Sequence, residues 1–143
     1  MRKLEEGMYK HFKGNYYYVH DVNVNHTETR EKLVYYTAQY GDYKSYVRPY
    51  EMFISEVDKI KYPNAQQKYR FERVKFYIEC EGKYLDYYDE LTDDIKAAKE
   101  YYSYEDAYNE IHPSEGMIEL GYYHFNSIYS RCKVKEVFIN LDE

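Results

Sequence analysis

The chain has 143 residues, a net charge of −6, no tryptophan and 23 tyrosines. This length suits one ordinary domain, or two small ones that share a core. No stretch approaches the roughly 18 apolar residues of a membrane span, and the first residues lack the apolar run of a signal peptide, so we expect a cytoplasmic protein without membrane contact.

Charge separates the chain into two parts. Residues 1–75 hold 14 Lys and Arg against 10 Asp and Glu, a net charge of +4, whereas residues 76–143 hold 6 against 16, a net charge of −10. Such asymmetry favours two units with different surfaces. We therefore predict an α+β, mainly β protein in which residues 5–75 form a small SH3-like β-barrel domain and residues 76–143 form an acidic α/β module packed on it.

Short strands dominate the first half. Runs rich in Tyr, Val and Phe, separated by Gly, Asn or Asp, predict strands at 7–14, 16–24, 32–40 and 44–48. Pro49 ends strand pairing, and "PYEMF" predicts one tight helical turn before extended structure resumes at "ISEV" and "RFERV". Five or so short antiparallel strands with one helical turn before the last fit a strongly bent barrel of SH3 type.

Hairpins and two short helices are expected in the second half. "KFYIECEGKYLDYYDE" predicts a hairpin that turns at "EGK". Thr92 and Ser103 are the predicted N-caps of the helices, and Ile95, Ala98 and Tyr102 lie on one face of the first. After the turn "PSEG", the segments "MIELGYYHF" and "KVKEVFIN" predict a C-terminal hairpin.

Motifs that carry catalysis or bind metal are absent from the sequence. Cys80 and Cys132 are far apart, and neither has a Cys or His at ligand spacing, so we predict two buried free thiols and no metal site. There is no P-loop, G-x-G-x-x-G, G-x-S-x-G or H-E-x-x-H motif. We therefore assign no catalytic residues and no cofactor, and we interpret Asp86, Asp89 and Glu90 as a solvated face.

A series of residues in the first half resembles a known family. The series is Gly7, Tyr9, His11, Phe12-Lys13-Gly14, Val19, His26, Glu28-Thr29, Leu33-Val34, Tyr40-Gly41, Val47-Arg48-Pro49, Met52-Phe53 and Phe71. Over about residues 5–75 it resembles the bacterial and phage family called domain of unknown function 1653, and "VRPxxMF" after "HFKG" is its most specific part. The segment "VHDVNVNHTET" is one residue longer than the family pattern. The resemblance supports the barrel and implies no reaction. The second half loosely resembles small phage-encoded α/β modules.

Arg48 is the central candidate for a binding site. In one interpretation its guanidinium forms a bidentate pair with Glu28, Glu51 or Glu72 and fixes the corner before Pro49, because a buried guanidinium must be paired. In the other, the planar fork holds a phosphate or carboxylate while Tyr rings stack on a flat group. The residues that we place with it in this ligand-binding site are His11, Lys13, His26, Tyr36 and Tyr46. Each histidine also admits a structural interpretation, in which it bonds to a turn.

Three function classes stay open. The first is a non-catalytic binder of a small anionic ligand, such as a nucleotide signal that a phage protein sequesters as an anti-defence sponge. The second is a protein interaction module or inhibitor that meets a host protein through its acidic half. The third is a small enzyme, which we rank last.

The acidic half disfavours duplex nucleic acid, and aromatic surface favours a homo-oligomer. The tyrosine excess fits either stacking surfaces or an AT-rich genome.

Overall fold

The chain divides into two compact units. The computed structural model describes residues 2–112 and 127–142. Unit 1 comprises Met1–Val74 and Phe138–Glu143, and unit 2 comprises Lys75–Val137. The boundary therefore lies close to the change in charge, and the packing of one unit on the other stays a prediction. None of the described helices is long and apolar enough to cross a membrane.

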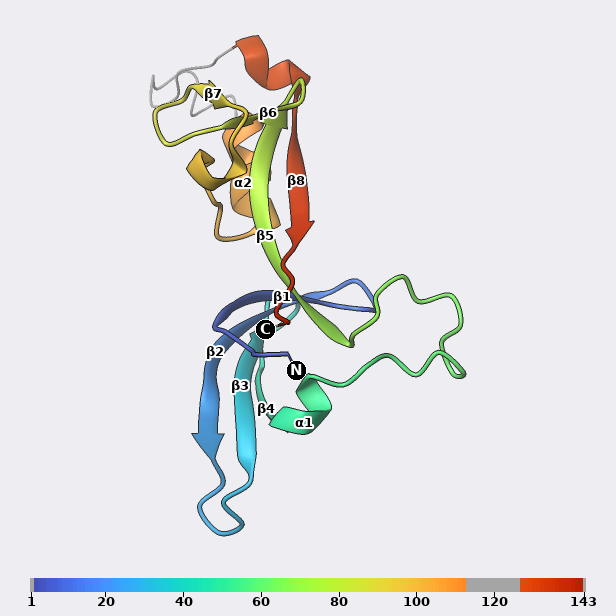
Figure 1. Cartoon of the computed structure of the whole chain (residues 1–143). Helices are drawn as coiled ribbons and strands as arrows, with labels where there is room; N and C mark the ends of the chain where they lie inside the picture. Colours follow the sequence, from blue (N-terminus) through green and yellow to red (C-terminus); the bar gives the residue numbers. More distant parts are fainter. Residues whose placement is uncertain (1, 113–126, 143) are drawn as a thin grey trace. The chain divides into compact units, whose positions relative to one another are not determined.

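Unit 1 is built on an open antiparallel sheet (Figure 1). The sheet has the order β4-β3-β2-β1-β5 in this unit. Its strands are β1 (Gly7–His11), β2 (Tyr16–Asn25), β3 (Lys32–Ala38), β4 (Ser45–Pro49) and the beginning of β5 (Phe71–Cys80). The predicted helical turn is confirmed, since α1 (Tyr50–Phe53) begins directly after Pro49. Closure of the sheet into an SH3-like barrel stays a prediction.

Burial along the strands follows the period of two that their sequences predict. In β3 the buried residues Val34, Tyr36 and Ala38 alternate with more exposed neighbours. The pairing of β2 with β3 shifts register twice, between Val19 and Asp21 and between Asp21 and Val24. Such irregularities are typical of β-bulges, by which one strand of a sheet absorbs an extra residue.

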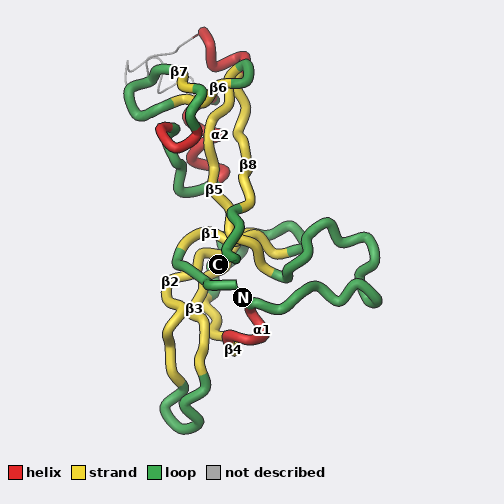
Figure 2. Tube along the Cα trace, viewed as in Figure 1, coloured by secondary structure: helices red, strands yellow, loops and turns green. Residues whose placement is uncertain are grey.

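A long loop joins α1 to β5 (Figure 2). At the expected extended segment "ISEV", Glu56 pairs with Tyr69 in an isolated antiparallel bridge rather than in a full strand. Side chains also hold the loop: Lys59 donates to the carbonyl of Gln67 (2.9 Å), and Gln67 donates to the carbonyl of Lys10 (3.0 Å). Tyr62 and its neighbours are thereby kept beside the turn that follows β1.

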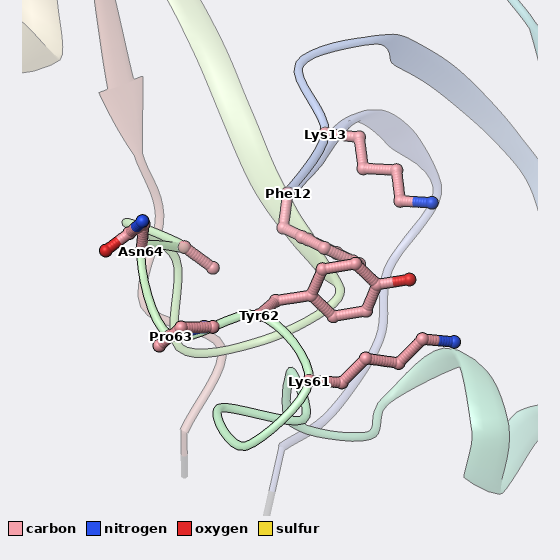
Figure 3. Close-up of a pocket in the computed structure, with 7 residues that line it drawn as sticks. Phe12, Lys13, Lys61, Tyr62, Pro63 and Asn64 are labelled. Carbon is pink, nitrogen blue, oxygen red and sulfur yellow. The ribbon is translucent and has the colours of Figure 1, made fainter.

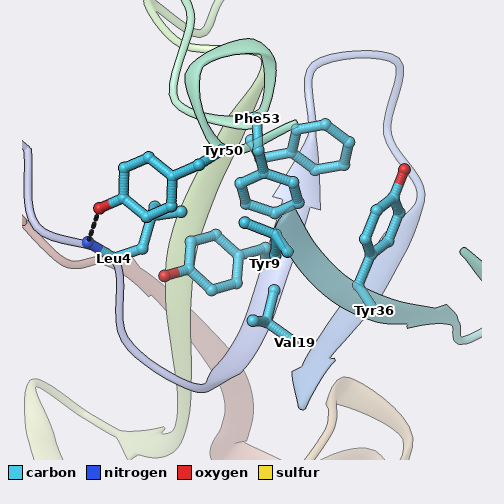
Figure 4. Close-up of a cluster of buried hydrophobic side chains, with 8 residues drawn as sticks. Leu4, Tyr9, Val19, Tyr36, Tyr50 and Phe53 are labelled. Carbon is cyan, nitrogen blue, oxygen red and sulfur yellow. Dashed lines mark hydrogen bonds between the residues drawn. The ribbon is translucent and has the colours of Figure 1, made fainter. Parts of the chain in front are cut away.

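Aromatic rings fill the core of unit 1 (Figure 4). The rings of Phe53 and Phe71 stack with centroids 4.1 Å apart and planes at 10°. Buried tyrosines keep their polar tips satisfied, since the Tyr9 hydroxyl donates to the Glu5 carbonyl (2.7 Å) and the Tyr50 hydroxyl accepts from the backbone N–H of Leu4 (3.4 Å). A tyrosine can therefore replace a phenylalanine here without leaving an unsatisfied hydroxyl.

Unit 2 combines short strands with short helices. Its elements are the rest of β5, β6 (Lys83–Leu85), β7 (Leu91–Thr92), the 3-10 helix η1 (Ile95–Ala97), α2 (Tyr104–Ile111), the 3-10 helix η2 (Ser127–Arg131) and β8 (Cys132–Phe138), which pairs with β5. The predicted hairpin is confirmed: Glu81 and Gly82 have φ of 52° and 85°, the positive values that a two-residue type I′ turn requires.

One of the two predicted helices is only a 3-10 turn. Asp94, rather than Thr92, caps it by accepting from the backbone N–H of Lys96 (2.9 Å). The residues that should have continued the helix pair as bridges, Ala98 with Asp86 and Tyr101 with Phe76. Strand pairing therefore replaces the helix.

The other helix is confirmed. Ser103 caps α2 by accepting from the N–H of Asp106 (3.1 Å), as its sequence predicts. The segment "KVKEVFIN" forms β8, whereas "MIELGYYHF" lies outside the described residues.

The prediction of two free thiols is wrong, because Cys80 and Cys132 form a disulfide. Cys80 ends β5 and Cys132 begins β8, so the pairing of these two strands brings their Cα atoms to 4.2 Å. The two residues are 52 positions apart in the chain, and sequence spacing could not reveal the contact.

Removing the disulfide should destabilise unit 2. A disulfide that closes a loop of this length lowers the conformational entropy of the unfolded chain. This effect stabilises the folded state by about 4 kcal/mol. We expect the double variant Cys80→Ala/Cys132→Ala to lose roughly 2 to 4 kcal/mol of unfolding free energy in the transition of unit 2, measured by urea denaturation. Dithiothreitol should produce a loss of the same sign in the wild type and none in the variant. An unchanged midpoint in the double variant would contradict the estimate.

Candidate functional site

Arg48 lies at the edge of the sheet with a buried guanidinium nitrogen that has no partner. It belongs to β4 and pairs with Val34 of β3, directly before Pro49. Its guanidinium carbon lies 5.5 Å from the centroid of the Phe71 ring. The Nη1 atom is buried and forms no hydrogen bond. A buried donor without an acceptor is costly, so its surroundings need an explanation.

The three glutamates proposed as partners do not pair with Arg48. No ion pair within residues 2–112 and 127–142 includes this arginine. Glu51 is exposed, and a carboxylate oxygen of Glu72 accepts from the backbone N–H of Tyr69 (3.3 Å). Glu28 lies in the β2–β3 turn, where its backbone N–H donates to His26. Within the described part of the chain, no carboxylate therefore pairs with the guanidinium.

Aromatic rings surround the guanidinium. The centroid of the Tyr36 ring lies 5.7 Å from that of Tyr46 and 5.7 Å from that of Phe71. Tyr17 contacts the same rings, and its hydroxyl shares a 2.6 Å hydrogen bond with that of Tyr40. Burial raises the pKa of Tyr36, and the nearby charge of Arg48 opposes this rise. We call the Arg48 cluster the set His11, Tyr17, Tyr36, Tyr46, Arg48 and Phe71.

His11 is the neutral member of the Arg48 cluster. Its ring centroid lies 4.8 Å from that of Phe71, and its Nδ1 accepts from the backbone N–H of Lys13 (3.1 Å). Burial, together with the positive charges of Arg70, Arg48 and Lys13, lowers its pKa to about 4. The ring is therefore neutral at pH 7 with the proton on Nε2, among three cations.

Lys13 lies in a cleft next to this cluster (Figure 3). The cleft has a volume of about 370 Å³ and is lined by Phe12, Lys13, Lys61, Tyr62, Pro63, Asn64 and Ala65. The ammonium groups of Lys13 and Lys61 lie 5.3 Å and 5.4 Å from the centroid of the Tyr62 ring. Both charges lower the pKa of the Tyr62 hydroxyl, although desolvation opposes them. We call this the Tyr62 cleft.

His26 is not part of either group. It follows β2, whereas His11 lies opposite the beginning of that strand. Its Nδ1 accepts from the backbone N–H groups of Glu28 and Thr29 (3.2 and 3.3 Å), which is the structural role considered for it. In the described part of the chain no group of three His, Cys, Asp or Glu could hold a metal ion.

Sequence reasoning missed several residues of this region. Arg70 acts electrostatically on both His11 and Tyr36, and its carbonyl accepts from the N–H of Phe12 (3.0 Å). Tyr62 comes from the loop at "KYPNAQQK", to which we assigned no binding role. The available signal was weak: a basic residue directly before a predicted strand, and a Tyr-Pro pair between two lysine-containing stretches.

The protonation of His11 should make unit 1 less stable in acid. The unfolded chain binds a proton with a pKa near 6.5, whereas folded His11 resists protonation until about pH 4. The unfolded state therefore binds more protons in this window, and unfolding free energy should fall as pH is lowered from 6.5 to 4 and then level off. The variant His11→Asn keeps an acceptor for Lys13 but does not titrate. The difference between the two urea-denaturation curves should show this slope, and parallel curves would contradict it.

Comparison with known proteins relates one segment of the chain to a family but indicates no activity. Residues 7–73 match the sequence model of a family described as "Protein of unknown function (DUF1653)". No curated protein and no solved structure matches the chain. The match covers β1 to β4, α1 and the beginning of β5, and it includes His11, Lys13, Arg48 and Phe71. The resemblance of residues 7–73, which make up most of unit 1, to this family is therefore confirmed.

Proposed function

We propose that unit 1 binds a small anionic ligand with a flat ring, of which a nucleotide is the main candidate, at the Arg48 cluster. The observation that carries this proposal is the buried Nη1 of Arg48, which has no hydrogen-bond partner and, among the described residues, no ion pair. A phosphate would supply two acceptor oxygens to a planar guanidinium. Binding would then satisfy a donor that the free protein leaves unsatisfied.

The charge around the cluster supports an anion in particular. Arg48 and Arg70 both act on His11 and Tyr36, and neither takes part in an ion pair among the described residues. His11 offers an Nε2–H donor in its neutral form. The exposed ring of Tyr46 provides a face on which a base can stack.

The biological form of this proposal is sequestration. A binder without a nucleophile or metal group would hold a nucleotide signal out of solution, as a phage anti-defence sponge does. The SH3-like barrel belongs to the same proposal, because short antiparallel strands with a one-turn helix fit that fold.

Unit 2 offers a second candidate function as a protein interaction module. It holds 14 Asp and Glu against 7 Lys and Arg, a net charge of −7. Several of its tyrosines are exposed, with 85% exposure for Tyr88 and 63% for Tyr87. On α2 the rings of Tyr108 and His112 stack with centroids 4.0 Å apart. Acidic surface with exposed Tyr rings fits a basic protein partner.

Replacing Arg48 should cost little stability. Since no carboxylate would be left unpaired, we expect Arg48→Met to change the unfolding free energy of unit 1 by about 1 kcal/mol or less in either direction. Arg73→Met is the matched control, because Arg73 pairs with Glu5 (3.0 Å) and donates to the carbonyl of Met8 (3.2 Å). That variant should lose roughly 2 to 4 kcal/mol. Urea denaturation measures both, and a loss above about 3 kcal/mol in Arg48→Met would instead indicate a structural pair.

A panel of linear and cyclic nucleotides tests the proposed ligand. A ligand present at 100 times its Kd stabilises the folded state by about 2.7 kcal/mol, so at least one nucleotide should raise the melting temperature of the wild type. Arg48→Met should abolish the shift, whereas Arg30→Gln, which removes an exposed cation at the β2–β3 turn, should retain it.

Sequestration and catalysis are separated by recovering the ligand. The ligand is incubated with excess protein, the protein is denatured, and the released molecule is examined by chromatography. Intact ligand supports sequestration, and a new product would assign chemistry to the site. The small-ligand proposal fails if no nucleotide shifts the melt, and a protein partner of unit 2 would then be sought.

A further inference from the structure

We propose that the Tyr62 cleft is a second anionic subsite, so that the ligand of unit 1 is a dinucleotide with one phosphate at Arg48 and a second phosphate between Lys13 and Lys61. This inference rests on the proposed function, since it extends the same ligand beyond the Arg48 cluster. In this proposal the two lysines of the cleft bind the second phosphate, and the Tyr62 ring stacks on the second base.

The cations of the Tyr62 cleft are available for an anion. Figure 3 shows Lys13 and Lys61 extending in the same direction, with the Tyr62 hydroxyl between their ammonium groups. In the described portion of the chain neither lysine takes part in an ion pair. Their charges act on Tyr62 instead. Two ammonium groups on one side of a cleft match the oxygens of a phosphate.

The aromatic side of the cleft is fixed in place. The rings of Phe12 and Tyr62 meet edge to face, with centroids 4.9 Å apart. The backbone of Phe12 is in turn held by its hydrogen bond to the carbonyl of Arg70 (3.0 Å). Such a ring can stack on any nucleotide base, because every base has a π face.

Arg70 connects the two subsites. Its charge acts on His11 and Tyr36 of the Arg48 cluster. It also lines a smaller cleft, of about 210 Å³, together with Phe12, Lys61, Tyr62, Glu56 and Asp58. The two acids there are already engaged: Asp58 accepts from the backbone of Ile60 and Lys61, and Glu56 lies 3.6 Å from Lys68. Arg70 thus contributes a cation to the lining between the two subsites.

The repetition of the same pair of features selects the ligand class. Each subsite combines unpaired cations with an accessible aromatic ring, and a dinucleotide repeats a phosphate and a base in the same way. A mononucleotide would occupy one subsite and leave the other without a partner. A nucleoside diphosphate has two phosphates but a single base, so it separates the contribution of charge from that of stacking.

Isothermal titration of the full chain tests the inference with AMP, ADP and the linear dinucleotide pApA. The wild type should bind pApA at least tenfold more tightly than AMP. Lys61→Gln should weaken pApA about tenfold, the effect of one lost charge-assisted contact, and leave AMP unchanged. Tyr62→Ala should weaken pApA at least fivefold, whereas Tyr62→Phe, which keeps the ring, should not. ADP should lose affinity in Lys61→Gln but not in Tyr62→Ala.

The outcomes separate the two proposals. Arg48→Met should weaken both AMP and pApA, and Arg30→Gln should weaken neither. If pApA binds no more tightly than AMP, or if Lys61→Gln weakens both ligands equally or neither, the second subsite is overturned while the Arg48 site stands. If neither AMP nor pApA binds the wild type, both proposals fail.

Discussion

Unit 1 depends on the position of one ring, that of Phe71. It stacks on Phe53 of α1 at 4.1 Å, and it meets the rings of His11, Tyr17 and Tyr36 at 4.8 to 5.7 Å. Because these residues come from α1, β1, β2 and β3, a single side chain at the beginning of β5 fixes four elements. Aromatic pairs of this kind contribute beyond their buried area. The sheet, the helical turn and the candidate site therefore share one packing centre.

The same ring offsets part of the cost of the Arg48 guanidinium, which no carboxylate of the described residues meets. The face of Phe71 lies 5.5 Å from the guanidinium carbon of Arg48, and a ring face attracts a cation weakly. This attraction is smaller than the cost of an unsatisfied buried donor. Elsewhere in the unit, Arg73 shows the ordinary solution: its guanidinium lies against Gly7, where a Cβ would clash with it, and it bonds to Glu5. The contrast between these two arginines sets Arg48 apart.

Tyrosines occupy both core and exposed positions in the described residues. In unit 1, Tyr9, Tyr36 and Tyr50 are core residues, and the hydroxyls of Tyr9 and Tyr50 bond to nearby backbone. In unit 2, Tyr87 and Tyr88 are exposed beside a strongly acidic sequence. Genome composition alone would account for tyrosines in the core, where a ring is needed. Exposed rings remove no apolar surface from water, which is why the exposed tyrosines of unit 2 support the proposal of an interaction module.

Local pattern determined most of the strands, the turn after Pro49, the hairpin at Glu81 and Gly82, and the Ser103 cap, because each depends on residues close in sequence. The family match followed from spacing within residues 7–73. Tertiary structure decided the rest. The Cys80–Cys132 disulfide depends on the pairing of β5 with β8, and the extended path at Ala98 depends on its bridge to Asp86.

The candidate site divides in the same way. The sequence indicated Arg48, His11 and Lys13 as candidates, because a charged or titratable side chain among apolar neighbours can be recognised in the sequence alone. Whether Arg48 meets a glutamate or a set of rings was set by which strands lie beside β4, and local sequence does not encode that choice. Arg70 and Tyr62 entered only through a long loop held by Lys59 and Gln67. Contacts between residues distant in the chain have no periodic signal, so the fold alone determined them.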